Sequence, residues 1–212
     1  MPGDPSTGRS SGAQRQLLDA AARLFAEHGV ERVSVRAIAE EAGVSHGSVR
    51  YHFRSKQELY REVLREYGPR VDRSTFEALE LELGDAPKKE HAERRLMAWL
   101  GDLLQAVGRP VGISDGLMHH ELCRAGGPSD LLFDSSIRPH HDELEALLAG
   151  FRPEWDPRRC RVVAIGIIAQ AIFFRMARPV AVRLLEEDAL DTCADEIAEV
   201  LVATILDGIR GT

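Results

Sequence analysis

Apolar residues recur at helical spacing along most of this 212-residue chain. The first amphipathic stripe is formed by Leu17, Ala21, Leu24 and Phe25. It predicts a helix over about residues 13–28, which Gly29 ends by taking a left-handed conformation. Strict alternation of apolar and polar residues, which would predict strands, is missing from the sequence. The pattern therefore predicts an all-α fold.

Two short helices follow and are joined by a tight turn. Ser34 is a good N-cap, and the apolar residues after it repeat at helical spacing. Gly43 can take the left-handed conformation that ends a helix. Ser45 then caps a second helix, in which Val49 and Phe53 lie on one face. Two short helices joined by a turn that contains glycine are typical of a helix-turn-helix.

Caps and breaks place the remaining helices. Ser55 and Glu58 form a capping box that opens a fourth helix, which runs to about residue 67 and, if Gly68-Pro69 only kinks it, on toward residue 83. Residues 84–87 break the pattern. Asp156-Pro157 is a strong helix start. The other stretches of helical spacing cover about residues 89–107, 114–124, 137–149 and 190–209.

The segment 162–177 is apolar on nearly every side. Its unbroken apolar part is shorter than the roughly 20 residues that cross a bilayer, and Gln170 interrupts it, so no membrane span is expected. A helix that is apolar all round must be buried on all sides. In a chain of this size, this predicts that one face packs on the core and another on a second copy of the chain, in a homodimer.

The net charge of −7 argues by itself against a nucleic-acid binder, but its distribution changes this conclusion. Residues 1–68 carry 10 Lys and Arg against 9 Asp and Glu, so the excess of acid lies in the rest of the chain. From Val44 to Gln57 there is no acidic residue. The helix-turn-helix is therefore the part best suited to approach DNA.

The three cysteines are widely spaced and odd in number, which indicates reduced thiols in a cytoplasmic protein rather than a disulfide framework. A thiol redox sensor is the alternative. The first dozen residues lack the apolar core of a signal peptide. We expect residues 1–12 to form a disordered arm, and an alternative role for it is a minor-groove contact through Arg9 and Arg15.

Three runs in and after the turn resemble the DNA-binding signature of TetR-type transcriptional regulators. They are Gly43-Val44-Ser45-His46-Gly47-Ser48-Val49, Tyr51-His52-Phe53 and Ser55-Lys56-Gln57-Glu58-Leu59, and the similarity continues upstream through residues 20–30. It covers roughly residues 13 to 64. The resemblance implies a DNA-binding domain over residues 13–60 and a larger helical ligand-binding and dimerisation domain over residues 61–212. In this family the last two helices of each subunit typically form an intermolecular four-helix bundle.

The second short helix is expected to enter the major groove of double-stranded DNA. We assign base-edge contacts to His46, Ser48 and Arg50, where many members of the family carry Tyr, and expect Gly47 to permit close approach. The residues that fit phosphate contacts are Ser34, Arg36, Ser45, Tyr51, His52 and Lys56. In the alternative interpretation, Tyr51 and His52 pack on the first helix and Lys56 is solvated.

The C-terminal half resembles the CecR-like branch of the family. The similarity rests on Glu121 after His120, Pro128-Ser129, Ile137-Arg138-Pro139 and residues 167–178, although that branch usually has Arg in place of His120. It implies a pocket for a small-molecule effector among the middle helices. The candidate lining residues are Trp99, Leu103, Met118, His119, Glu121, Cys123, Gln170, Phe173 and Phe174. The alternative for Trp99 and the two phenylalanines is an ordinary core position.

No cofactor is expected, and no phosphate loop or HExxH motif is found in the sequence. The runs 119–121 and 140–142 contain His and acid, but neighbouring residues on a helix point about 100° apart and do not readily share one ion. The resemblance to TetR-type regulators implies a non-enzymatic repressor that binds a palindromic operator as a dimer and is released by a small molecule. The alternative is a helical enzyme or metal-binding protein with an architectural helix-turn-helix.

Overall fold

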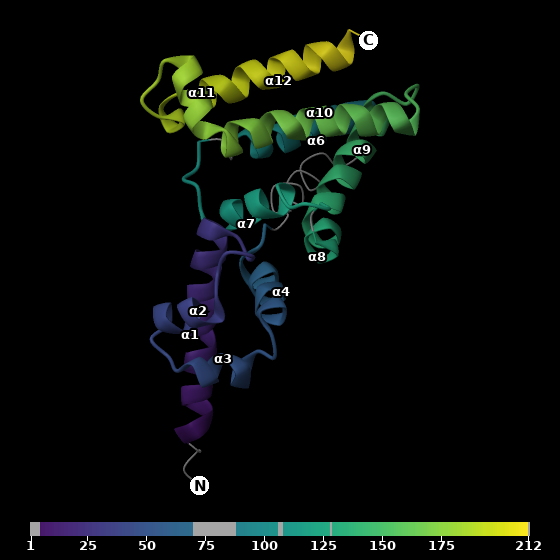
Figure 1. The fold of residues 1–212 in the computed structure, drawn as a ribbon. Coiled ribbons are helices and arrows are strands. Elements are labelled where there is room, and N and C mark those ends of the chain that lie inside the picture. The colour runs from purple at the N-terminus through teal and green to yellow at the C-terminus, as the bar shows by residue number, and fades with distance from the viewer. Residues whose placement is uncertain (1–4, 70–87, 106–107, 128, 212) are drawn as a thin grey trace. The chain divides into compact units, whose positions relative to one another are not determined.

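The structure, a computed structural model, describes residues 5–69, 88–105, 108–127 and 129–211, and contains no strand within these ranges (Figure 1). The predicted all-α fold is confirmed. The elements in chain order are α1 (Pro5–His28), α2 (Val35–Glu41), α3 (His46–His52), α4 (Lys56–Tyr67), α6 (Lys88–Gln105), α7 (Ile113–Leu122), α8 (Asp130–Leu132), the π-helix η1 (Phe133–Ile137), α9 (Arg138–Phe151), α10 (Pro157–Met176), α11 (Arg178–Leu185), the 3-10 helix η2 (Leu190–Thr192) and α12 (Ala194–Arg210).

The chain divides into two compact units. The first comprises residues 1–70 and 111–135, and the second comprises residues 71–110 and 136–212. Helices α7 and α8 therefore pack with α1–α4, although they follow α6 in the sequence. This division describes packing; the predicted assignment of DNA binding to residues 13–60 and of ligand binding and dimerisation to residues 61–212 stays a prediction.

The core of the first unit lies around α1, which packs against α2, α3, α4 and α7. Phe25 of α1 is fully buried, and its ring meets the ring of Tyr60 of α4 edge to face, with centroids 5.2 Å apart. Helices α2 and α3 contribute Ile38, Val49 and Phe53 to the same core. Burial of these side chains fixes the helix-turn-helix on α1 and α4.

Helix α7 approaches α1 so closely that one position admits only glycine. A Cβ atom at Gly116 would lie 2.4 Å from the carbonyl oxygen of Ala26 and 2.9 Å from its Cβ. Close by, Gly29 ends α1 with φ +78°, and a Cβ there would meet the ring of His120 at 3.0 Å. The end of α1 is thus fitted onto α7 without room for a methyl group.

A buried carboxylate joins α4, α7 and α8. Glu121 of α7 is 1% exposed; it accepts the Tyr60 hydroxyl at 2.7 Å and the Ser129 backbone amide at 2.6 Å, and Arg124 lies 3.5 Å away. Burial raises the pKa of this carboxyl, but the bonds from Ser129 and Tyr60 and the charge of Arg124 outweigh burial and hold the pKa below its usual range. Glu121 is therefore ionised inside the unit.

The second unit is built on α6, which packs against α9, α10 and α12. The centre of its core contains Trp99 and Leu100 of α6, Leu144 and Leu148 of α9, and Ala164 of α10. Asp156 accepts the Arg159 amide at 3.0 Å and Pro157 lies in the first turn of α10, so the predicted helix start is confirmed. Helix α10 carries one buried stripe, formed by Cys160, Ala164, Ile167 and Ala171.

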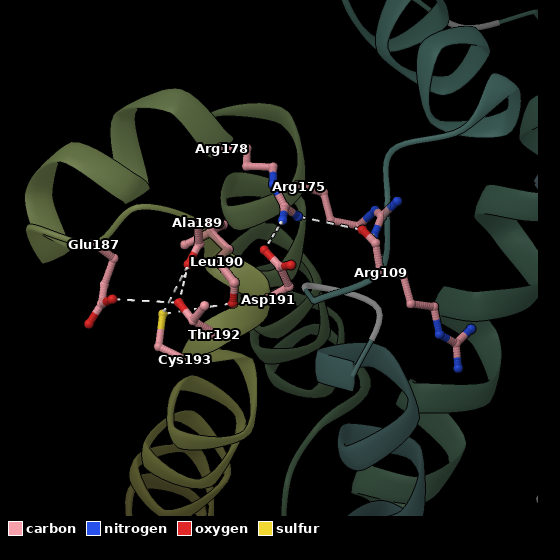
Figure 2. A network of polar contacts seen from close by, with 9 residues as sticks. All are labelled: Arg109, Arg175, Arg178, Glu187, Ala189, Leu190, Asp191, Thr192 and Cys193. Carbon is pink, nitrogen blue, oxygen red and sulfur yellow. Dashed lines mark hydrogen bonds and ion pairs between the residues drawn. The ribbon is translucent and has the colours of Figure 1, made fainter.

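Polar contacts hold the segment between α11 and α12 in the second unit (Figure 2). Arg178 pairs with Asp191 at 3.3 Å and also donates, as Arg175 does, to the carbonyl of Arg109 at 3.5 Å. The Thr192 hydroxyl donates to the Ala189 carbonyl at 2.6 Å. These contacts fix the turn η2 directly before α12.

Several predicted boundaries were wrong. Helix α1 begins at Pro5 rather than about residue 13, so the predicted disordered arm overlaps it, and residues 1–4 lie outside the described residues. Helix α12 begins at Ala194 rather than about residue 190, because η2 and its turn precede it. The sequence did not predict α8, η1 or α11. The extension of the fourth helix toward residue 83 and the break at 84–87 lie outside the described residues.

No single helix in the described ranges is long and apolar enough to span a membrane. Helices α10 and α11 have the required length and composition only when taken together, and they are bent by 87° against each other.

We expect Gly116→Ala to destabilise the protein by about 1–3 kcal/mol, because the new methyl group would force α7 away from the backbone of α1. Urea denaturation followed by circular dichroism measures this change. Gly101→Ala is the control, since a Cβ at that helical position meets nothing within 4 Å. Equal stability of the Gly116→Ala variant and the wild type would contradict the close contact between α1 and α7.

Tyr60→Phe should reduce the free energy of unfolding by about 1–3 kcal/mol at neutral pH, because the buried carboxylate of Glu121 loses a donor. Since the folded-state pKa of Glu121 lies below its unfolded value, the carboxylate stabilises the fold above the unfolded pKa, and this contribution is lost as the pH falls through the folded pKa. The deficit of the variant should therefore shrink on acidification. Denaturation curves from pH 7 down to pH 3 test this. Tyr51→Phe, at a residue 80% exposed, should match the wild type throughout.

Candidate nucleic-acid interface

Capping positions and a left-handed glycine shape the helix-turn-helix as the sequence predicts. The Ser34 side chain accepts the Ala37 amide at 3.0 Å at the start of α2, and Gly43 takes φ +66° after its end. Ser45 is the N-cap residue of α3, but its hydroxyl makes no bond to the helix backbone and lies 2.9 Å from the Ser48 hydroxyl. The hydroxyls of Ser45 and Ser48 are therefore hydrogen-bonded to each other at the start of α3.

One side of α3 is buried and the other side faces solvent. Val49 and Phe53 are 2% and 3% exposed, whereas Tyr51 is 80% exposed. The exposed predicted DNA contacts are Ser34, Arg36, Ser45, His46, Gly47, Arg50 and Tyr51, while Ser48 and His52 are half-buried. The alternative in which Tyr51 packs on the first helix is wrong. Its ring contacts that of His52 edge to face at 5.0 Å between centroids.

Two acids of α2 are held in ion pairs. Glu40 accepts the Arg36 guanidinium at 2.8 Å, and this bond raises the pKa of Arg36. Glu41 pairs with Arg23 of α1 at 3.1 Å. Both pairs are exposed, and exposed ion pairs contribute little to stability, so a phosphate can compete for Arg36. Helix α3 itself carries no acid.

Lys56, at the start of α4, is turned into the protein. Its ammonium donates to the carbonyl oxygens of Val30 and Val33 at 2.9 and 3.2 Å, and the side chain is half-buried. The alternative of a solvated Lys56 is therefore wrong. Next to it, one half of the predicted capping box is present, because the Ser55 hydroxyl accepts the Glu58 amide at 3.1 Å. In the other half, the Glu58 carboxylate accepts the backbone amide of Arg54 at 3.2 Å instead of the amide of Ser55.

The nine predicted ligand-lining residues belong to both compact units. Met118, His119, Glu121 and Cys123 lie in the first unit, where Glu121 is already bonded to Tyr60 and Ser129. The residues in the second unit are Trp99, Leu103, Gln170, Phe173 and Phe174. Trp99 is a buried core residue, Gln170 donates to the Gly166 carbonyl of its own helix at 3.3 Å, and Phe173 is 46% exposed. A shared pocket stays a prediction.

Two open hollows lie within the second unit. One, of about 380 Å³, lies between α6 and α9 and is lined by residues that include His91, Arg95 and Glu143. The other, of about 350 Å³, is lined by Phe174, Ile197 and Leu201 among others. Of the predicted lining residues, Phe174 reaches one of these two hollows.

Metal and thiol chemistry find little support. No group of three or more His, Cys, Asp or Glu in the described ranges is placed to hold a metal ion. Burial raises the pKa of the Cys160 and Cys193 thiols, which keeps them in the less reactive protonated form. Cys123 is exposed.

Two family models match this chain. Residues 17–63 match "Bacterial regulatory proteins, tetR family", and residues 92–209 match "HTH-type transcriptional dual regulator CecR, C-terminal domain". The second match covers more than half of the chain. Between them, the two matches include α3, α7 and all but the last residue of α12.

Similar proteins agree with the family models. The chain is 47% identical over 64 residues to the HTH-type transcriptional repressor KstR2 of Rhodococcus jostii, and 35% identical over 65 residues to the repressor AcnR of Corynebacterium efficiens. These matches cover 30% and 31% of this chain and 31% and 35% of the relatives, so they span about a third of each protein.

Solved structures extend the similarity to nearly the whole chain. NalD, the secondary repressor of the MexAB-OprM multidrug efflux pump in Pseudomonas aeruginosa, shares 21% identity with a TM-score of 0.58, over 94% of this chain and 97% of NalD. The hemolysin II transcriptional regulator HlyIIR shares 16% identity with a TM-score of 0.59, over 92% of this chain and 97% of HlyIIR. At these identities the similarity establishes the fold alone. Together with the two family models, it shows that this chain belongs to the TetR family of bacterial regulatory proteins, with a C-terminal half of the CecR type.

Proposed function

We propose that this protein is a transcriptional repressor that binds a palindromic DNA operator as a homodimer and is released by a small-molecule effector. The observation that carries the proposal is the outer face of α3. It is free of acid in an acidic chain, and it exposes an aromatic ring at Tyr51 and a cation at Arg50. KstR2 and AcnR, which share this region, are described as repressors.

The contacts are assigned by chemistry and exposure. His46 and Ser48 at the start of α3, with Arg50 one turn on, present hydrogen-bonding groups to base edges in the major groove. Gly47, which has no side chain, lies between them and allows the helix to approach the bases. Ser34, Arg36, Ser45, Tyr51 and His52 surround this face and donate to phosphate oxygens.

A dimer is supported by the exposed apolar stripe of α10. Val162, Ile165 and Phe173 are 61%, 51% and 46% exposed, and with Ala169 they follow one another at spacings of three and four residues. This stripe is distinct from the buried stripe that packs on the core. On α12, Val200 is a further apolar residue, 58% exposed. A second copy of the chain would cover these side chains.

Two reading heads are also needed for tight binding, because a single small DNA-binding module buries limited surface. In a twofold dimer they would read half-sites about 34 Å apart, or a multiple of that spacing. Fluorescence anisotropy with DNA from upstream of the protein's own gene tests the proposal directly. Binding that requires both half-sites supports it, and absence of binding at low salt would overturn it.

The effector part of the proposal rests on the family and on the predicted lining residues. Of these, Phe174 lines a hollow of about 350 Å³, a volume within the usual range for small-molecule sites. A thermal-shift screen of small molecules, followed by release of labelled DNA, would identify the effector. A compound that raises the melting temperature and lowers DNA affinity is the expected result.

Replacing Arg36, a proposed phosphate contact, by Ala should weaken DNA binding with little loss of stability, because the side chain and its ion pair with Glu40 are exposed. If Arg36 neutralises one phosphate in each subunit of the dimer, the slope of log K against log salt concentration should fall in magnitude by about 1.8. Anisotropy titrations over a range of salt concentrations measure both quantities. Arg158→Ala, which removes an exposed cation at the start of α10, is the control and should change neither.

Replacing Ile165 by Glu should convert the dimer to a monomer with unchanged helix content, because a charge would have to be buried in the interface. Analytical ultracentrifugation gives the mass, and circular dichroism checks the fold. Val111→Glu introduces the same charge at a residue that is 56% exposed outside the stripe and should leave the dimer intact. A dimeric Ile165→Glu variant would place the interface elsewhere.

A further inference from the structure

The ammonium of Lys56 connects two segments that are far apart in the sequence. It belongs to the first turn of α4, and its two acceptors, the carbonyl oxygens of Val30 and Val33, lie in the loop between α1 and α2. The distances of 2.9 and 3.2 Å are those of good hydrogen bonds. One side chain thus links the start of α4 to the loop that leads into the helix-turn-helix.

The loop carbonyls need such a donor. Among the described residues, no backbone amide bonds to the oxygens of Val30 or Val33. Val33 is only 4% exposed and belongs to the core of the first unit. A carbonyl in such surroundings is costly to leave without a hydrogen bond, and a bond to a charged donor is stronger than a neutral one.

The same contact explains why a cation is tolerated at this place. A positive charge in the first turn of a helix is disfavoured by the helix dipole. Two carbonyl oxygens at bonding distance supply the compensating negative partial charges. The compensation is therefore present in the protein itself, before any phosphate is bound.

We propose that Lys56 is a positioning residue for DNA binding, which locks the α1–α2 loop onto α4 and so sets the orientation of α2 and α3, rather than a ligand of the DNA backbone. This inference rests on the proposed DNA-binding function. The sequence predicted that Lys56 acts only when it contacts a phosphate. The proposal instead gives Lys56 a role in the free protein, through its bonds to two backbone carbonyls.

Amine acylation tests the contact without DNA. The chain has three lysines, Lys56, Lys88 and Lys89, so the peptide that carries Lys56 is identified by mass spectrometry without ambiguity. In the DNA-free native protein, Lys56 should react with an acetylating reagent at least about tenfold more slowly than in the urea-unfolded protein, because the side chain is half-buried and its nitrogen is held against two carbonyl oxygens. Equal rates, with protection only after operator DNA is added, would overturn the proposal and restore the phosphate contact.

Lys56→Met tests the consequence for DNA binding. The variant should bind operator DNA about tenfold or more weakly, with a salt slope equal to that of the wild type, because no phosphate contact is removed. Loss of a phosphate ligand in both subunits would instead reduce the magnitude of the slope by about 1.8, which is the outcome expected of Arg36→Ala. A slope reduced in this way in Lys56→Met contradicts the positioning role.

The measurement is made at a temperature where circular dichroism shows the variant fully folded. A positioning role predicts that the loss of affinity persists there, whereas a role in overall stability alone predicts wild-type affinity and would overturn the inference. Failure of the wild type itself to bind operator DNA would refute the proposed function, and the acylation result would then still decide whether the contact between Lys56 and the loop exists.

Discussion

The outer face of α3 depends on the burial of its inner face. A helix of seven residues is not stable alone in water, because nucleation costs more than so few hydrogen bonds return. Helices α2 and α3 each have this length and are held by Ile38, Val49 and Phe53 in the core around α1. Every polar residue proposed to contact DNA takes its direction from that packing, and the turn at Gly43 fixes the angle between the two helices.

The support for this core extends beyond the helix-turn-helix. Helix α7 follows α6 in the sequence but packs with α1 in the same compact unit, where Gly116 allows backbone contact and Glu121 accepts the Tyr60 hydroxyl of α4. An ionised carboxylate is costly to bury, so this arrangement persists only because its donors are all in place. A shift of α7 would therefore disturb the bond between Glu121 and Tyr60 and so the position of α4. Helix α4 also carries Lys56, which contacts the loop between α1 and α2.

The sequence predicted the local elements well and the distant contacts poorly. Ser34, Gly43 and Asp156 act through bonds to residues within five positions, so caps and turns could be predicted from neighbouring residues alone. The partners of Lys56 and Glu121 lie in other segments, and the sequence offers no signal for them: Glu121 reads as a pocket residue and Lys56 as a phosphate ligand. Helix α11 was missed because Arg178-Pro179 follows α10 directly, and proline at a first turn looks the same as proline that ends a helix.

The acidic charge of the whole protein sets the conditions under which the α3 surface can work. At a net charge of −7, the distant field of the protein repels DNA, while the field close to α3 is set by the cations Arg50 and Arg54. Salt at physiological strength screens interactions between charges separated by more than about 8 Å. It therefore weakens the repulsion between DNA and acids beyond that distance, while the direct contacts at α3 remain. The local absence of acid between Val44 and Gln57 therefore matters more for binding than the total charge. A twofold dimer would present this local surface twice, so the local charge would act at both half-sites.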